Sequence, residues 1–279
     1  MASASTLLTI DEFLKYKHVN RDMLPEIQEF YNTNKTKFNR PINNWRKYGN
    51  EPKTNDNWLI ANKFKQTDDE KLYSQFRCIL NKLSDGNFDS LAKEIITLDI
   101  EKQEHLLKLA EFIFNKAILE NKFCITYAKL SKELSGYYVK DNDKIAYFRE
   151  LLINKCQQMF NECVFFDPSI DNNTMISKEI STGCMIFIGE LYNCELLTNK
   201  IINSCFLLLL KRLEQNKINI IDNICALMRI VGKIFVNKCS VETNLIFEKL
   251  DKLMKSGTLN NKDKFSLMDL FDMKKDNKW

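Results

Sequence analysis

Residues 148–163 read FRELLINKCQQMFNEC and show the clearest periodicity in the chain. Eight of these residues follow one another at intervals of 3, 1, 3, 1, 3, 1 and 3 positions, which places them on one face of an α-helix. The positions are Phe148, Leu151, Leu152, Lys155, Cys156, Met159, Phe160 and Cys163. All of them except Lys155 can face a core, so the stretch predicts a helix buried along one side.

The same apolar stripe recurs on both sides of this segment, and no segment shows sustained β-type alternation. The recurring stripes are Leu72, Phe76, Ile79, Leu80 and Leu83; Leu106, Leu109, Ala110, Ile113 and Ala117; Ile201, Ile202, Cys205, Phe206, Leu209 and Leu213; and Ile221, Ile224, Leu227, Met228 and Val231. These stripes predict an all-α fold.

Short polar breaks separate the stripes. In Ser84-Asp85-Gly86-Asn87, Gly86 can end one helix and Asn87 can cap the next. Helix pairs recur every 40 to 47 residues or so, which is the period of HEAT-type solenoids. We therefore expect about five antiparallel helix pairs in residues 70–279, with a globular helical bundle as the alternative.

Residues 1–69 differ from the rest of the chain. They contain three of the four prolines and many Asn and Thr residues, and their one short apolar cluster is Leu7 to Leu14. We interpret this region as an extended arm that precedes the helical repeats.

The composition points to an intracellular protein. The 41 basic and 37 acidic residues nearly balance, so charge alone does not indicate a nucleic-acid binder. The nine cysteines contain no C-x-x-C pair, which favours buried, reduced thiols. No apolar run is long enough for a membrane span, and no secretory signal opens the chain. We expect a cytoplasmic protein that does not associate with a membrane.

The motifs of common catalytic sites are missing. Only two histidines occur, His18 and His105, so a histidine triad or a multi-histidine metal site is hard to assemble. Neither G-x-x-x-x-G-K-[ST] nor G-x-G-x-x-G is present. We expect a non-catalytic protein with no cofactor and no metal.

Three blocks of sequence resemble the middle domain of translation initiation factor 4G, and with weaker matches between them they cover roughly residues 70–279. The first block is Phe76 to Ser84 followed by Phe88. The second is Phe187 to Leu191 followed by Leu196 to Thr198, and the third is Phe265 to Asp272, ending with Asn277 and Trp279. The usual proline after the first block is Asp85 here, and the charged insertion before the second is reduced to about Val164 to Ser177. The resemblance implies the same HEAT-type fold.

The resemblance also implies a partner, the DEAD-box RNA helicase initiation factor 4A. A scaffold that touches one helicase lobe at each end would keep the lobes near each other and raise turnover. By match to the family, the helicase-binding candidates are Leu80, Leu83, Phe88, Lys264, Phe265, Asp269 and Asp272. Leu80 and Leu83 also lie on the core stripe, so packing is an equal alternative for Leu80. Gly189 in the second block can permit close helix approach.

The arm carries two further candidate sites. In the family, an upstream Tyr-x-x-x-x-Leu-apolar motif binds the cap-binding factor 4E, and Leu8, Phe13 and Leu14 have this spacing with Leu8 in place of Tyr. An intramolecular helix is the equal alternative. A mixture of basic and aromatic residues could bind mRNA, and its members are Lys35, Lys37, Arg40, Trp45, Arg46 and Lys47. A solvated linker is the alternative for that stretch.

The sequence therefore predicts a translation initiation scaffold that binds and stimulates initiation factor 4A and links it to the cap-binding factor. Two alternatives stay open. One is a translational repressor or nuclear adaptor of the same fold that sequesters partners. The other is an RNA-binding protein without a helicase partner.

Overall fold

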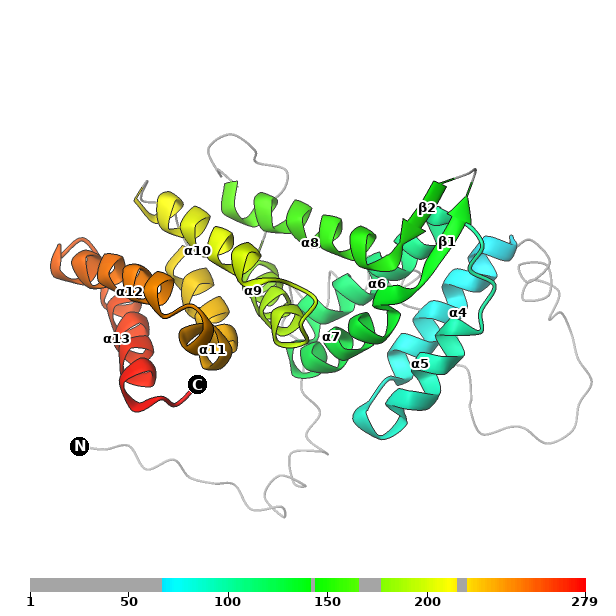
Figure 1. Ribbon diagram of the computed structural model, residues 1–279, viewed down its shortest axis with the longest axis horizontal. Coiled ribbons are helices and arrows are strands. Elements are labelled where there is room, and N and C mark those ends of the chain that lie inside the picture. Colours follow the sequence, from blue (N-terminus) through cyan, green and yellow to red (C-terminus); the bar gives the residue numbers. More distant parts are fainter. Residues whose placement is uncertain (1–66, 142–143, 166–176, 215–219) are drawn as a thin grey trace, which may run out of the picture. The chain divides into compact units, whose positions relative to one another are not determined.

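The computed structural model describes residues 67–141, 144–165, 177–214 and 220–279, all of which belong to one compact unit. These residues form ten α-helices, three short 3-10 turns and one two-stranded hairpin (Figure 1). The all-α prediction is confirmed. In this part of the chain no helix is long and apolar enough to cross a membrane.

The helices form five consecutive pairs within the described residues. The pairs are α4 (Asp68–Lys82) with α5 (Phe88–Ile96), α6 (Gln103–Leu119) with α7 (Cys124–Glu133), α8 (Phe148–Phe165) with α9 (Lys178–Asn193), α10 (Asn199–Leu213) with α11 (Ile220–Lys238), and α12 (Ser240–Lys255) with α13 (Asn261–Asp276). The 3-10 turns are η2 (Asp85–Asn87), η3 (Asn121–Phe123) and η4 (Leu134–Gly136). Helix α8 ends at Phe165 and α9 begins at Lys178, which agrees with the insertion expected at about Val164 to Ser177.

The pairs stack in two layers. The first helices of successive pairs contact one another in the order α4, α6, α8, α10 and α12, and the second helices do so in the order α5, α7, α9, α11 and α13. Three hydrogen bonds connect neighbouring pairs: Thr126 to Asp85, Ser181 to Asn223 and Cys225 to Ser266. The bonded residues are 41, 42 and 41 positions apart in the sequence. These separations match the repeat period of the sequence, and the prediction of about five helix pairs is confirmed.

A hairpin interrupts the helical series, which the sequence patterns do not anticipate. Strand β1 (Tyr138–Asp141) pairs antiparallel with β2 (Lys144–Tyr147), and Tyr138 lies opposite Tyr147. Val139 and Ala146 are buried while their neighbours along each strand are exposed or half-buried. Four residues per strand are too few for the alternation to stand out from helical patterns.

The apolar residues of the predicted stripes are buried or pack against the core, with one exception. The stripe of α4 is buried at all five positions, and so are the stripes of α6 and α11. Ile201 is an error in the prediction for α10, since its side chain is 36% exposed and lines a groove instead of the core.

Helix α9 approaches its neighbours closely at two positions where the residue is glycine. A Cβ added at Gly183 would overlap the carbonyl oxygen of Ile118 at the end of α6. A Cβ added at Gly189 would lie 2.7 Å from Cγ2 of Ile230 on α11. The prediction that Gly189 permits close helix approach is confirmed, and Gly183 plays the same role on the α6 side.

The helix ends are fixed by local hydrogen bonds. Thr67 and Glu70 form a capping box at the start of α4. The Glu70 carboxylate accepts a hydrogen bond from the backbone N–H of Thr67 and thereby caps the helix. Asn87 is the N-cap residue of α5, as predicted, but its side chain makes no capping hydrogen bond to that helix. Its side-chain oxygen accepts from the backbone N–H of Ser84 and its amide donates to the carbonyl of Lys82, both at 2.7 Å, so Asn87 closes the end of α4.

Asp222 joins three helices. Its carboxylate, on α11, lies 2.6 Å from Nζ of Lys178 on α9 and 3.2 Å from Nζ of Lys262 on α13. Burial opposes the ionisation of Asp222, but the hydrogen bonds from the two lysines outweigh it, so the pKa of Asp222 is lowered. The lowered pKa means that the ionised form stabilises the folded state.

We expect Gly183→Ala to lower the free energy of unfolding by about 3 kcal/mol or more, because the new methyl group can be placed only by moving the backbone of α6 or α9. Gly86→Ala is the control, since nothing lies within 4 Å of a Cβ added there. Urea unfolding followed by circular dichroism measures both. Equal unfolding midpoints for the two variants would contradict the close approach of α9 to α6.

We expect Asp222→Asn to lower the free energy of unfolding by about 1 kcal/mol at pH 7. Because the folded-state pKa is lowered, this contribution is present above the unfolded pKa of about 4 and is lost as the pH falls through the folded value. Unfolding curves of the variant and the native chain should therefore converge below about pH 3. Asp251→Asn, which removes an exposed pair with Lys255, is the control and should change little at either pH.

Candidate partner-binding surfaces

The turn between α4 and α5 places the first group of candidates in two different environments. Leu80 and Leu83 are buried, with 1% and 6% of their side-chain surface exposed, and both belong to the core. Phe88 is half-buried and packs at the margin of that core. The core interpretation therefore describes Leu80 and Leu83, and Phe88 is the accessible member of the three.

The same turn is held rigidly from two sides. Asn87 fixes it to the end of α4, as described above, and the hydroxyl of Thr126 on α7 donates to the carboxylate of Asp85 at 3.1 Å. The Tyr127 hydroxyl donates to Glu120 at 2.7 Å, and burial raises its pKa well above the usual range for tyrosine. A phenol that stays protonated keeps this donor in place.

The second group of candidates shares the outer face of α13. Lys264, Phe265, Asp269 and Asp272 are all exposed, and Phe265 has 62% of its surface free. The positions 265, 268, 269 and 272 follow helical spacing, so they form one stripe. Met268, which is 44% exposed, belongs to this stripe and was missed from the sequence, although its place three residues after Phe265 could have indicated it.

The start of α13 has its own cap, and its end is anchored by the C-terminal tryptophan. Asn260 accepts a hydrogen bond from the backbone of Asp263 at 2.8 Å, and Asn277 ends the helix in the left-handed conformation. The indole of Trp279 packs on Gly232 of α11, where a Cβ would overlap its ring. The exposed stripe is therefore presented by a helix that is fixed at both ends.

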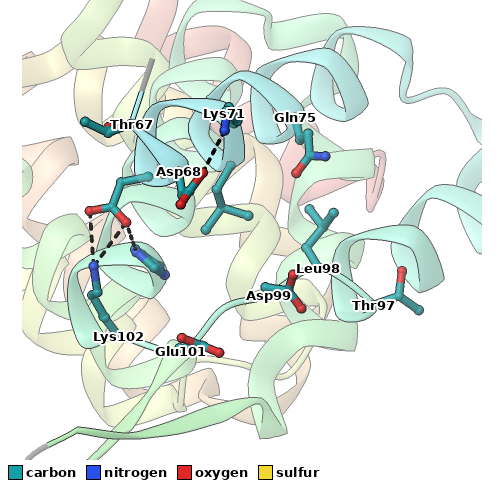
Figure 2. A pocket seen from close by; sticks show the side chains of 12 residues that line it. Thr67, Asp68, Lys71, Gln75, Thr97, Leu98, Asp99, Glu101 and Lys102 are labelled. Carbon is teal, nitrogen blue, oxygen red and sulfur yellow. Dashed lines mark hydrogen bonds and ion pairs between the residues drawn. The ribbon is translucent and has the colours of Figure 1, made fainter. Parts of the chain in front are cut away.

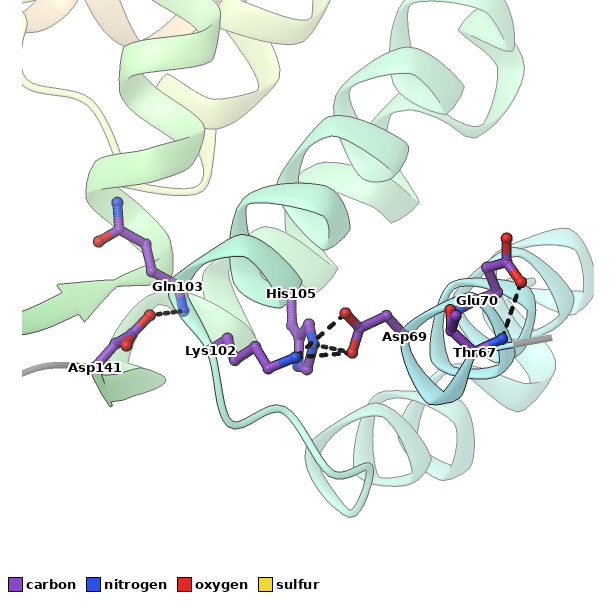
Figure 3. A network of polar contacts seen from close by, with 7 residues as sticks. All are labelled: Thr67, Asp69, Glu70, Lys102, Gln103, His105 and Asp141. Atoms are coloured by element: carbon purple, nitrogen blue, oxygen red, sulfur yellow. Dashed lines mark hydrogen bonds and ion pairs between the residues drawn. The ribbon is translucent and has the colours of Figure 1, made fainter. Parts of the chain in front are cut away.

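Asp69 is the centre of a polar network between α4 and α6 (Figure 3). Its Oδ1 lies 3.0 Å from Nε2 of His105 and 3.1 Å from Nζ of Lys102. The hydrogen bond from Lys102, followed by that from His105, lowers the pKa of Asp69. His105 is buried and its Nδ1 has no hydrogen-bond partner among the described residues. The network joins α4 to α6 and thereby links the first two helix pairs.

A hollow of about 680 Å³ opens beside this network, lined by α4 and the segment between α5 and α6 (Figure 2). Its lining is polar and includes Asp68, Lys71, Asp99 and Glu101. The Asp68 carboxylate pairs with Lys71 at 2.7 Å. The hollow also borders Thr67, the first described residue.

A smaller hollow of about 310 Å³ lies between α8 and α10 and is largely apolar. Ile153, Phe160, Ile201 and Leu208 line it, and Lys200 is its one charged lining residue. Neither hollow contains a candidate residue from the sequence.

Other candidates lie outside the described residues. These are the proposed cap-binding-factor contacts Leu8, Phe13 and Leu14 and the proposed RNA contacts Lys35, Lys37, Arg40, Trp45, Arg46 and Lys47. Within the described ranges no three His, Cys, Asp or Glu side chains gather as a metal site. Six of the nine cysteines are buried, as expected, and burial raises the pKa of the Cys205 thiol to about 12.

Comparison with known proteins identifies the family of this chain. Residues 75–277 match the family model of the MIF4G domain, a range that begins within α4 and ends directly after α13. The chain belongs to the MIF4G domain family.

Proteins similar to this MIF4G chain include three curated translation factors. It is 29% identical over 225 residues to eukaryotic translation initiation factor 4G of Triticum aestivum, an alignment that covers 74% of this chain and 15% of the wheat protein. It is 27% identical over 235 residues to eukaryotic translation initiation factor 4 gamma 1 of Mus musculus, covering 75% of this chain and 14% of that protein. The Arabidopsis thaliana factor 4G is 30% identical over 225 residues, which cover 74% of this chain and 13% of the plant protein. The chain thus spans about one seventh of the length of these relatives.

One similar solved structure is the MIF4G domain of Trypanosoma cruzi translation initiation factor EIF4G5. Its TM-score is 0.49 at 20% sequence identity, and the match covers 74% of this chain and 96% of the other. MIF4G domains are non-catalytic protein-interaction scaffolds, which agrees with the missing catalytic motifs of this sequence.

We expect Leu80→Ala to lower the free energy of unfolding by about 2 to 5 kcal/mol, because it opens a cavity in the core of the first helix pair. Leu245→Ala on α12, where the native side chain is 56% exposed, is the matched control and should stay within about 0.5 kcal/mol. Thermal unfolding of both variants provides the measurement. Small effects of similar size for the two variants would show that Leu80 lies at the surface and not in the core.

Proposed function

We propose that this MIF4G domain is a translation initiation scaffold that binds the DEAD-box helicase initiation factor 4A through two separate surfaces. The first is the α4–α5 turn with Phe88, and the second is the exposed stripe of α13 with Phe265 and Met268. The observation that carries the proposal is that accessible aromatic residues, Phe88 and Phe265, lie on the first and the fifth helix pair. Both belong to blocks for which the resemblance implies helicase contacts.

The physical basis is the fixed framework between these surfaces. Each lobe of a DEAD-box helicase must close on ATP and RNA and then separate again. A scaffold that binds both lobes raises their effective concentration near each other, which lowers the entropic cost of closure. Binding that leaves the lobes slightly apart also keeps product release fast. The scaffold would thus raise turnover while the helicase supplies the chemistry.

The proposal extends to the cap-binding factor 4E, which would bind at Leu8, Phe13 and Leu14, and to an action in the cytoplasm on mRNA. The motif spacing in the sequence is its support. The alternative of a repressor or nuclear adaptor of the same fold differs in one measurable respect, because a sequestering protein binds the helicase without raising its turnover.

We expect the isolated chain to have no ATPase activity and to increase the RNA-dependent ATPase rate of purified initiation factor 4A. Saturating amounts of the scaffold are added to the helicase with RNA, and phosphate release is followed. Binding without stimulation would favour the sequestering alternative, and neither binding nor stimulation would refute the helicase partner.

We expect Phe88→Ala and Phe265→Ala each to weaken helicase binding by about 2 kcal/mol, roughly thirtyfold, as for aromatic anchors at an interface. Phe265→Ala should leave the stability of the free scaffold nearly unchanged, and Phe88→Ala should lower it by only about 1 kcal/mol because the ring is half-buried. Val241→Ala on α12, 69% exposed in the native chain, is the control for both. Calorimetric titration gives the affinities, and a folded Phe88→Ala variant with native affinity would exclude the first surface.

A further inference from the structure

Two acidic stretches of the sequence meet at the hollow between α4 and the segment that joins α5 to α6 (Figure 2). Residues 67–71 and residues 97–105 each contain three carboxylates and one lysine. Together they carry a formal charge of −4 with His105 neutral, whereas the whole chain carries +4. A local excess of one sign attracts groups of the opposite sign.

Half of these carboxylates have no partner within the domain. The three on α4 are engaged by the ion pairs and the capping box described above. Asp99, Glu101 and Glu104 are exposed and make no hydrogen bond or ion pair among the described residues. The two lysines that line the hollow, Lys71 and Lys102, are both paired already. The unengaged charge at the hollow is therefore negative.

The segment that carries Asp99 and Glu101 is fixed in place. Ile100, which lies between them, is buried in the core with 7% of its surface exposed. The segment ends at the start of α6, where the backbone N–H of Gln103 donates to the carboxylate of Asp141 at 3.1 Å (Figure 3). Carboxylates on a fixed segment lose little conformational entropy when a partner binds them.

His105 gives a second, independent indication of the ligand. It lines the hollow with only 5% of its surface exposed. Its Nε2 lies 3.0 Å from the Asp69 carboxylate, which can only accept, so Nδ1 of the neutral imidazole is an acceptor. Nδ1 is buried and has no partner in the described part of the chain. A ligand that donates hydrogen bonds would satisfy this nitrogen as well as the carboxylates.

The wall of the hollow also offers aliphatic surface, from Leu72 and Leu98. Hydrogen-bond acceptors beside aliphatic groups suit a side chain with an apolar stem and a cationic head. Arginine fits best, because its guanidinium has five donors and no acceptor. Nucleic acid is disfavoured, since its phosphates would face the unengaged carboxylates.

We propose that this hollow binds a basic peptide segment of a partner protein, in which an arginine pairs with Asp99 and Glu101 and lays its stem against Leu72 and Leu98. The site lies at the start of α4, whereas the Phe88 turn follows the end of that helix, whose 15 residues span about 22 Å. The inference goes beyond the proposed function and requires no helicase.

The test titrates the full chain into a short fluorescein-labelled peptide of arginine and leucine residues and follows fluorescence anisotropy. The control peptide has citrulline in place of each arginine, which keeps the shape and removes the charge. We expect the arginine peptide to bind about tenfold or more tightly than the citrulline peptide. Its affinity should fall as the salt concentration rises, because the carboxylates are exposed.

Two double variants locate the binding. Asp99→Asn with Glu101→Gln removes the unengaged carboxylates of the hollow, and Glu150→Gln with Glu248→Gln removes two exposed carboxylates of α8 and α12. Both variants change the net charge equally. We expect the hollow variant to bind the arginine peptide about tenfold or more weakly, and the control to stay within about twofold of the native chain.

Gln75→Arg is a further variant, and it leaves every carboxylate in place. Because Gln75 lines the hollow, the new guanidinium competes with the peptide and should weaken its binding severalfold. This variant supplies the deciding measurement if the hollow variant has a lower melting temperature than the native chain.

The outcomes are distinct from those of the proposed function. Equal weakening by the two double variants would show general charge attraction and overturn the inference, as would equal affinity for the arginine and citrulline peptides or no binding of either. Helicase stimulation is measured separately, so its absence would refute the proposed function and leave a peptide site at the hollow standing.

Discussion

The close contact of α9 with its neighbours is the constraint on which the other contacts depend. Gly183 lets the backbone of α9 reach the carbonyl oxygen of Ile118, and Gly189 lets it reach the side chain of Ile230. Helix α9 touches helices of the second, third and fourth pairs, so its position sets the step from the first half of the repeat series to the second. Since backbones cannot approach so closely across a Cβ, glycine at these two positions determines the spacing of the middle of the domain.

Polar joints at intervals along the series complete this framework. Asp69 joins α4 to α6, the buried pair of Ser181 and Asn223 joins α9 to α11 at 3.0 Å, and Asp222 joins α9, α11 and α13. Each joint links neighbouring pairs, as expected for a repeat structure in which stability is the sum of units and the interfaces between them. Hydrogen-bonded polar groups at such interfaces also fix the register, because a shifted helix would leave them buried and unsatisfied.

This framework explains why candidate binding residues stand on turns and on the last helix. Inside the series, each helix covers the apolar face of the next, and side chains such as Leu80 and Leu83 disappear into the core. Among the described residues, the α4–α5 turn and the stripe of α13 keep such side chains accessible. Large apolar residues that remain exposed there are held on rigid supports, which suits a scaffold that binds a folded partner.

The sequence alone determined the helices, their pairing and the family. Helical stripes 3 and 4 residues apart report which side of a segment is apolar, and their recurrence at about 40 to 47 residues reports the repeat. The same local information placed Gly189 at a close contact and Phe88 after a turn.

Tertiary structure decided which of those residues are accessible. The hydrogen bonds that locate the α4–α5 turn come from Thr126 and Tyr127, which are 41 and 47 residues away in the sequence. No local pattern could show that Leu80 is buried while Phe88 is half-exposed, that the side chain of Asn87 bonds back to the end of α4, or that residues 138–147 form a hairpin. A periodic pattern in the sequence shows which side of a helix is apolar. The groups that cover this side belong to the next repeat, and they reach it only when the helix pairs stack.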